Sequence, residues 1–317
     1  MARINSKNNA GGLARTWQGS AAPRSGTATD ATLVGSANPG DLYTDTSTYT
    51  VYINEGTQAS PYWTPVSYSQ PGIRAVFSDF RDTGDVIAVG GSTMSTELNS
   101  GIRVFGDGAA DTDSGLTVAN VAEVGNVATI TTTNEASHIL ALGMGEHEVA
   151  NVQADTNGPA VIDVTFSHVS AITARATGIG FIGTLADALV EPVTGASTTI
   201  TLVQDDVALM FQDSGLTDAD GIFLATNKSN AAATVATTGA GVDLSQTIAA
   251  AATYQRWRVE LAEDGDITCF INKVQVGTVA VGLDIDEEHS PVFYLAANAA
   301  AGKQATLKQV AMWYQRV

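Results

Sequence analysis

Short apolar runs broken by turn residues are the feature that most constrains the fold of this chain. Between residues 73 and 317, runs rich in Val, Ile, Thr and aromatic residues recur at a spacing of roughly 8–12 residues, with Gly, Asp or Asn between them. This spacing leaves little room for long helices and is typical of β-sandwiches and barrels. The sequence therefore predicts an all-β, antiparallel β-sandwich body over residues 73–317.

The predicted strands fall in two groups. The first group covers Ala75–Phe80, Asp85–Val89, Gly101–Phe105, Leu116–Val121, Val127–Thr133 and Ile139–Leu142. The second group covers Ala160–Ser167, Ile172–Ile182, Ser197–Thr201, Val207–Gln212, Gly221–Thr226, Gln255–Ala262, Ile267–Asn272, Val274–Val279, Val292–Ala297 and Leu307–Tyr314. Only Ser245–Thr253, with its alanine run, favours a helix, and a segment this short forms at most a connector.

The run 256–261 gives the clearest strand signal. Its apolar residues Trp257, Val259 and Leu261 alternate with two arginines and a glutamate, which predicts a half-buried antiparallel strand. The acidic turn that follows contains Gly265, which can adopt a positive φ. Asn272 and Lys273 then form a two-residue hairpin turn between two further strands.

The block from Tyr254 to Thr278 resembles the concanavalin-like jelly roll, also called the laminin-G-like sandwich. The acidic turn at Gly265 and the following strand with its own hairpin carry this resemblance, although Lys273 stands where the turn usually has Gly. It spans about residues 160–317 and implies an antiparallel sandwich. The same sandwich supports lectins, glycanases and structural modules, so the fold does not decide the function.

The first 72 residues differ from the body. Residues 1–39 are polar, rich in Gly, Ala, Ser and Asn, and are predicted to form an extended N-terminal arm without its own core. Residues 40–72 are predicted to form a small β-hairpin attachment module, covered by Trp63. The order Gly-Asp-Leu-Tyr-Thr-Asp-Thr-Ser-Thr, followed by Tyr and Trp, resembles short segments of tailed-bacteriophage virion and fibre proteins.

The charge distribution limits the partners. The formal net charge is −18, yet residues 1–29 contain four basic residues and no acidic one. An acidic body repels phosphate backbones, so nucleic acid is not an expected ligand. The candidates for contact with a partner are basic arm residues and aromatic residues, of which Tyr62 and Trp63 are expected to be exposed in a loop. The full set is Arg3, Lys7, Arg15, Trp17, Arg24, Tyr62 and Trp63.

Several other features argue against disulfide-stabilised, membrane-spanning and exported proteins. The single cysteine, Cys269, cannot form an intramolecular disulfide and is expected to be a buried, inert thiol. The sequence has no 18-residue apolar run, so no membrane span is expected. Its start lacks a hydrophobic signal core, so we expect synthesis in the host cytoplasm.

No enzyme signature is found, and no cofactor is predicted. The four histidines lack zinc-binding spacing, and the Glu-x-Asp-x-x-Glu pattern of jelly-roll glycanases is missing. Glu146 and Glu148 could share a face of a strand, but neighbouring glycines favour a turn. Two Asp-rich loops are candidates for calcium, although their composition is also that of ordinary turns. These candidates are Asp107, Asp111 and Asp113 in one loop, and Asp213, Asp218 and Asp220 in the other.

Together, these features predict a non-enzymatic virion structural protein. The preferred hypothesis is a capsid decoration or head-fibre protein on the virion surface, fastened by its N-terminal part to the major capsid protein or another virion protein. We expect a homo-oligomer, with a trimer as the working assumption. The alternative is a receptor-binding tail-fibre or spike module that recognises host surface glycans.

Overall fold

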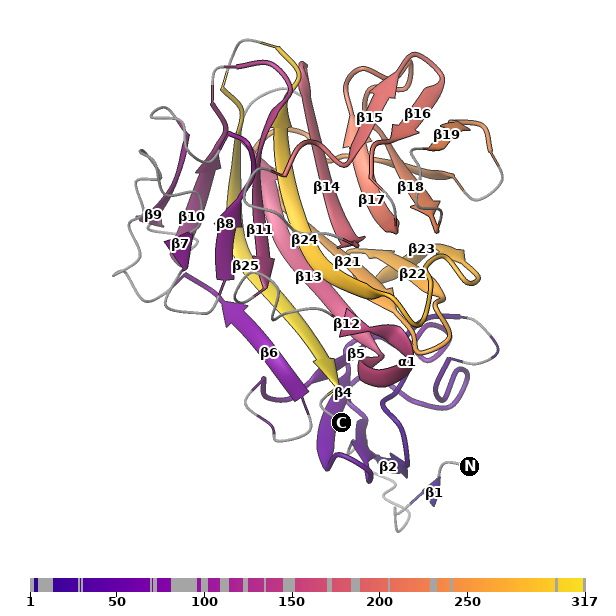
Figure 1. The fold of residues 1–317 in the computed structure, drawn as a ribbon. Coiled ribbons are helices and arrows are strands. Elements are labelled where there is room, and N and C mark those ends of the chain that lie inside the picture. The colour runs from indigo at the N-terminus through magenta and orange to yellow at the C-terminus, as the bar shows by residue number, and fades with distance from the viewer. Residues whose placement is uncertain are drawn as a thin grey trace.

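In the part of the chain that it describes, the structure, a computed structural model, contains four β-sheets and one short helix, α1 (Ala154–Asn157). Figure 1 shows two large sheets packed face to face and two small sheets at their periphery. The described residues are 3–4, 14–27, 29, 31–68, 70, 73–80, 96–97, 102–108, 114–121, 125–133, 135–144, 152–169, 173–183, 189–204, 206–228, 233–239, 242–299 and 302–315.

The first large sheet has eight strands. In spatial order it runs β23 (Val274–Val279), β22 (Ile267–Ile271), β21 (Gln255–Leu261), β13 (Ala160–His168), β25 (Gln304–Gln315), β10 (Gly125–Thr131) and β9 (Gly115–Val121). The eighth strand, β6 (Ile73–Ser78), pairs with the carboxy-terminal end of β25. All of these pairings are antiparallel.

The second large sheet has nine strands. Its order is β20 (Asp243–Thr247), β18 (Gly221–Asn227), β17 (Val207–Asp213), β14 (Arg175–Ile182), β24 (Glu288–Ala297), β11 (His138–Met144), β8 (Ile102–Phe105) and β7 (Thr96–Glu97). The ninth strand, β12 (Val152–Gln153), pairs with the start of β24. Successive strands alternate repeatedly between the two large sheets: the chain crosses between β6 and β7, β8 and β9, β10 and β11, β12 and β13, β13 and β14, β20 and β21, β23 and β24, and β24 and β25.

The main core lies between the two large sheets. Trp257 of β21 packs edge-to-face on Phe166 of β13, with ring centroids 5.1 Å apart, and Phe293 of β24 reaches the same ring from the opposite sheet. Val259 and Leu261 are fully buried in this core, as the alternation in β21 predicts. The sequence prediction of an all-β, antiparallel sandwich is therefore confirmed.

Two turns follow the sequence analysis. Gly265 adopts φ +83°, the left-handed conformation expected for the acidic turn. Asn272 and Lys273 both have positive φ, 50° and 70°, as a type I′ hairpin turn requires. A lysine thus occupies a left-handed position that glycine would fill at lower cost. The helical tendency of Ser245–Thr253 is not realised, because β20 occupies 243–247 and turns follow.

The N-terminal residues fold differently from the prediction. The N-terminal sheet comprises β1 (Arg3–Ile4), β2 (Thr16–Gly19), β3 (Leu42–Asp45), β4 (Thr50–Asn54) and β5 (Trp63–Pro65). The prediction of an extended arm is wrong for residues 14–39, because β2 pairs in parallel with β3. Trp17 and Ala37 of this segment share a small core with Tyr43, Tyr52 and Trp63. Long-range packing therefore orders a segment whose composition alone suggests disorder.

A second small sheet covers the outer face of the second large sheet. This cover sheet comprises β15 (Val193–Ala196), β16 (Thr199–Leu202) and β19 (Ala233–Ala236), and in Figure 1 it lies beside β17 and β18. Its Ile200 and Leu202 pack with Leu209 and Phe211 of β17 in a second apolar cluster. Of the predicted strands, Asp85–Val89 lies outside the described residues.

Candidate functional site

A buried carboxylate, that of Asp163, lies at the centre of the contacts that fix the N-terminal sheet to the sandwich. Asp163 lies on β13, and its side chain is fully buried. It accepts hydrogen bonds from Nε and Nη2 of Arg256, at 2.8 and 2.7 Å, and from the hydroxyl of Tyr62 at 2.8 Å. Arg256 also pairs with Glu55 of the N-terminal sheet at 3.1 Å. The Asp163 carboxylate therefore accepts hydrogen bonds from Arg256 of the sandwich and from Tyr62 of the N-terminal part.

Arg258 forms the second contact at the interface between the N-terminal residues and the sandwich. We call this interface, which includes Asp163, Arg256 and Arg258 of the sandwich and Glu55, Tyr62 and Trp63 of the N-terminal part, the seam. Its guanidinium carbon lies 4.2 Å from the ring centroid of Tyr62 and 4.9 Å from that of Trp313. Nη2 donates to the carbonyl oxygen of Trp63 at 2.7 Å and pairs with Glu260 at 2.6 Å. The alternation in β21 predicts that the face with Arg256, Arg258 and Glu260 is exposed to solvent. This prediction is wrong, because the N-terminal sheet buries that face.

The predicted partner-binding residues are mostly engaged within the chain. Tyr62 and Trp63, expected to be exposed, have exposed fractions of 0% and 1%. Arg15 pairs with Asp41 at 2.9 Å, and the indole nitrogen of Trp17 donates to the same carboxylate at 3.1 Å. For Arg3 only the backbone is described, in β1, and Lys7 lies outside the described residues.

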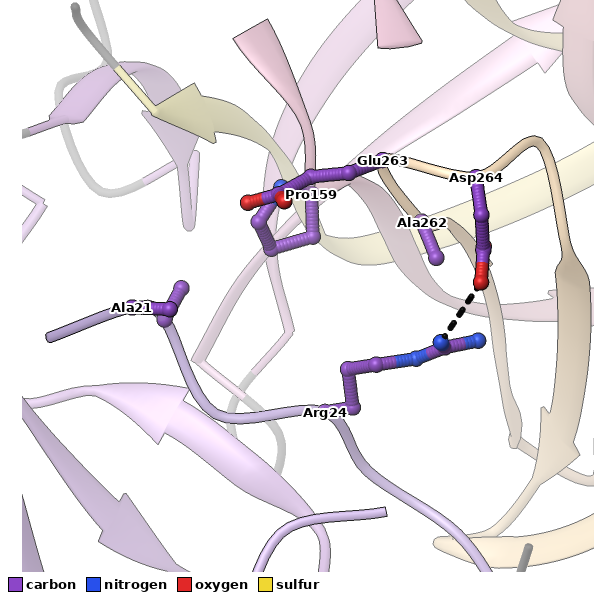
Figure 2. Close-up of a pocket in the computed structure, with 7 residues that line it drawn as sticks. Ala21, Arg24, Pro159, Ala262, Glu263 and Asp264 are labelled. Atoms are coloured by element: carbon purple, nitrogen blue, oxygen red, sulfur yellow. Dashed lines mark hydrogen bonds and ion pairs between the residues drawn. The ribbon is translucent and has the colours of Figure 1, made fainter. Parts of the chain in front are cut away.

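Arg24 lies at a small cavity in the seam (Figure 2). The cavity has a volume of about 180 Å³, between the N-terminal segment and the turn that follows β21. Arg24 extends across it and pairs with Asp264 at 3.1 Å and with Asp266 at 3.3 Å. The Arg24 guanidinium is therefore part of the seam.

The calcium candidates are distributed over several places. Two of them, Asp111 and Asp113, lie outside the described residues. The carboxylate pair Glu146 and Glu148, considered above for a different role, also lies outside them. The Asp107 carboxylate accepts the backbone N–H of Ile139 at 2.9 Å. Within the described part of the chain, no group of three or more His, Cys, Asp or Glu residues could hold a metal ion.

The second Asp-rich loop is also held by internal hydrogen bonds. The Asp213 carboxylate accepts N–H groups from Gly215 at 2.7 Å and Gly195 at 2.5 Å, and the Asn298 amide at 2.7 Å. Burial, and then a hydrogen bond and the charge of Asp220, raise the pKa of Asp218. These carboxyl groups interact with protein donors or with one another.

A buried acidic cluster lies under the cover sheet. Burial first, and then the charges of Asp213 and Asp107, raise the pKa of Glu191 well above its usual value. The hydroxyl of Tyr294 is fully buried without a hydrogen-bond partner, and burial, Glu191 and Asp213 raise its pKa. The structure therefore brings together two calcium candidates from separate loops, but it encloses them beneath β15 and β16.

A hollow lined by hydroxyl groups lies on the first large sheet. It has a volume of about 310 Å³ and is found where β13 ends, β25 begins and the loop before β21 passes over the sheet edge. The lining residues are Val127, Thr129, Ser167, His168, Val169, Ala252, Tyr254 and Thr306. Ser167 and Thr306 pair across β13 and β25. Four of these residues carry hydroxyl groups, and none of them is acidic.

Strand alternation places the hydroxyls on the outer face. Ala128, Ile130, Ala305 and Leu307 point into the core between the sheets. Val127, Thr129 and Thr306 therefore point outward. The N-terminal sheet covers the opposite ends of β13 and β25, through Asp163 and Gln315, so the hollow lies on the part of this face that it leaves free. The sequence gives no sign of this site, because its residues come from four segments that are distant in the chain.

His168 borders the hollow and is held neutral. Its exposed fraction is 2%, and neither ring nitrogen has a hydrogen-bond partner among the described residues. Burial, and then the charge of Arg175, lower its pKa well below the usual value. Its ring packs edge-to-face on Phe166, with centroids 5.3 Å apart. The imidazole therefore lines the site without contributing a positive charge.

Comparisons with known proteins give similarities of fold only. No family model matches the chain, and no curated protein matches it. Three solved structures are similar over much of their length. A protein of unknown function from Shewanella oneidensis MR-1 is 13% identical, with a TM-score of 0.48, over 77% of this chain and 87% of that one. Peanut lectin is 9% identical, with a TM-score of 0.43, over 77% of this chain and 99% of that one.

The third is a carbohydrate esterase from the Shiga toxin-encoding bacteriophage phi24B. It is 11% identical, with a TM-score of 0.39, over 68% of this chain and 91% of that chain. Similarities of this size assign neither an activity nor a ligand. In the described part of the chain, no helix is long and apolar enough to span a membrane.

Proposed function

We propose that this protein is a non-enzymatic binding protein whose sandwich recognises glycans through the hollow beside Tyr254. The observation that carries the proposal is the lining: hydroxyl groups from three strands and one loop surround a space of about 310 Å³. Hydroxyl groups both donate and accept, which matches the alternating donors and acceptors of a sugar. The volume lies near the lower end of small-ligand sites, roughly 300–1,000 Å³.

Tyr254 supports a sugar ligand more than an apolar one. Its ring is half-buried and belongs to the loop that leads into β21. An aromatic ring with a hydroxyl at one end offers an apolar surface and a polar tip. Sugar rings have the complementary character, with C–H groups on their faces and hydroxyls at their edges.

The composition of the hollow argues against glycan cleavage there. A glycosidase needs two carboxyl groups that flank the scissile bond. None of the described residues that line the hollow is Asp or Glu. We therefore place binding, without hydrolysis, at this site.

The test is a glycan panel probed with the intact protein and two variants. We expect at least one glycan to bind, and Tyr254→Ala to weaken it by about tenfold or more, since burying an aromatic ring contributes about 1.5–3 kcal/mol. The control, Tyr49→Ala, removes an exposed tyrosine in the N-terminal sheet and should bind normally. Failure of every glycan to bind, or equal affinity of both variants, would contradict the proposal.

The capsid role is a second proposal, and the structure changes how it should be tested. The phage-like segment forms β3 and β4 of the N-terminal sheet, which supports an attachment function for this part. Trp17, Ala22 and Ala37 belong to its core, so deleting residues 1–40 would unfold the module along with the arm. A deletion of residues 1–13 is the informative variant for binding to a capsid.

The expected result is loss of capsid binding with at most a small fall in the thermal unfolding temperature, because the deletion removes only the two-residue edge strand β1 from the N-terminal sheet. Capsid binding that survives this deletion would place any attachment surface on the N-terminal sheet or the sandwich. Virion-surface location and trimeric assembly belong to the same proposal. Sedimentation of the intact protein measures the oligomeric state.

A further inference from the structure

One cation without a carboxylate partner among the described residues contacts Tyr254, which lines the hollow; the cation itself, Lys308, lies beside the lining and is not part of it. Lys308 lies on β25, two residues after Thr306, so its side chain shares the outward face of that strand. Its ammonium nitrogen lies 5.0 Å from the ring centroid of Tyr254. Among the described residues, Lys308 forms no ion pair, although the chain has a formal net charge of −18.

The position of this ammonium group is set by the ring below it. A lysine side chain has four rotatable bonds and loses entropy when it is fixed. An ammonium over an aromatic face gains about 0.5–1 kcal/mol at an exposed site, enough to bias its position without neutralising its charge. Tyr254 therefore holds a net positive charge at the edge of the hollow.

The surroundings of the hollow leave this charge available. Its described lining has no acidic side chain, and His168 is neutral because burial lowers its pKa. Two arginines between the N-terminal segment and the sandwich, by contrast, pair with acids: Arg24 with Asp264, and Arg256 with Asp163. Lys308 differs from them because it lies beside a hollow whose described lining has no acidic side chain, where a negatively charged group would be bound favourably.

We propose that the glycan recognised at the hollow is acidic, with a carboxylate or sulfate group that binds Lys308. The inference rests on the proposed glycan function and adds the charge class of the ligand. The neutral hydroxyl lining would recognise the sugar ring, and the ammonium would recognise its anionic substituent. Because the charge is partly exposed, the contribution of Lys308 should weaken as salt is added.

The experiment uses two ligands that differ only in charge. Oligogalacturonate and its methyl ester have the same sugar rings, while esterification removes the carboxylates. A sulfated oligosaccharide and its desulfated form give the corresponding pair for sulfate. Each is titrated into the intact protein, into Lys308→Gln and into Lys303→Gln. Lys303 immediately precedes the same strand, and among the described lysines only Lys308 lies over the Tyr254 ring, so Lys303 is the matched control.

We expect at least one acidic ligand to bind about tenfold more tightly than its neutral partner at low salt, equivalent to about 1.4 kcal/mol. The preference should disappear in Lys308→Gln and persist in Lys303→Gln. Equal affinity for charged and neutral forms, or an unchanged preference in Lys308→Gln, would overturn the inference while leaving glycan binding intact. If no glycan of any charge binds, the proposed function itself fails, and the inference fails with it.

Discussion

Asp163 connects two parts of the chain that are far apart in sequence. Its carboxylate is fully buried and accepts three hydrogen bonds within 2.8 Å, from Arg256 and Tyr62. A buried carboxylate tolerates this environment only while its partners remain, and the partners depend on it in turn. At the residue scale, Asp163 is therefore a major contributor to the attachment of the N-terminal sheet, beside Arg258, Arg24 and Gln315.

Replacing Asp163 tests this dependence. Asp163→Ala leaves the Arg256 charge and the Tyr62 hydroxyl without their buried acceptor, and should lower the free energy of unfolding by about 3–5 kcal/mol. Urea unfolding measures the change. Asp286→Ala, at an exposed position, is the control and should stay within about 0.5 kcal/mol of the parent protein. A loss below about 1 kcal/mol for Asp163→Ala would contradict this account.

Glu191 makes stability depend on pH in the opposite sense from most carboxylates. Its folded-state pKa lies well above the usual 4.5, through burial and then the charges of Asp213 and Asp107. The protonated form is therefore favoured in the folded protein. Its contribution to stability is fully present below pH 4.5 and is lost as the pH rises through the folded-state pKa.

The variant Glu191→Gln should remove this dependence. An amide stays neutral, so the variant should be more stable than the parent at alkaline pH, by about 1 kcal/mol or more, and the difference should shrink towards acidic pH. Thermal unfolding of both proteins from about pH 4 to about pH 9 measures it. Stability curves that remain parallel across this range would show that Glu191 does not titrate as described.

At the scale of elements, the hairpin of β22 and β23 has the type I′ turn that suits two antiparallel strands, but it places a lysine in a left-handed backbone conformation. Lys273 adopts φ +70°, which costs a non-glycine residue about 1 kcal/mol. Its contact with Glu55, at 3.5 Å, is between partly exposed groups and contributes little. Lys273→Gly should therefore stabilise the protein by about 0.5–1 kcal/mol. Chemical unfolding measures the change in the free energy of unfolding. The control, Lys273→Gln, loses the charge and keeps a side chain at this position, so its free energy of unfolding should change little. A glycine variant less stable than the parent would refute the argument.

The elements also show what the sequence could predict. The alternation in β21 identifies its core-facing residues, because a period of two is a local property. The burial of Arg256 and Arg258 is not local, since polar residues on the second face look the same whether water or another sheet covers them. Trp17 illustrates the same limit: its partners Tyr43 and Tyr52 come from later strands, so nearby sequence gives no sign of the core that orders it.

The candidate site was harder to predict than the fold. Thr129, Ser167, Tyr254 and Thr306 are common residues without a motif. Only the pairing of β25 with β13 and β10, and the loop before β21, bring them together. The aromatic residues that did attract attention, Tyr62 and Trp63, are structural. A conspicuous aromatic pair in a loop can therefore serve an internal interface, while an inconspicuous group of hydroxyls forms the open site.

For the whole molecule, the two small sheets decide which surfaces remain for binding. The N-terminal sheet covers one end of the first large sheet, and the cover sheet encloses the acidic cluster on the second (Figure 1). The hollow beside Tyr254 lies outside both. The central claim is that this hollow binds a glycan.

Hydrogen exchange of the intact protein, with and without the best glycan from the panel, tests this claim most directly. The account predicts slower exchange at residues 127–129, 167–169, 252–254 and 304–306, with little change in the seam at residues 21–24 and 262–264. Protection confined to the seam, to the cover sheet or to the N-terminal sheet would contradict it, because the ligand would then occupy a different surface.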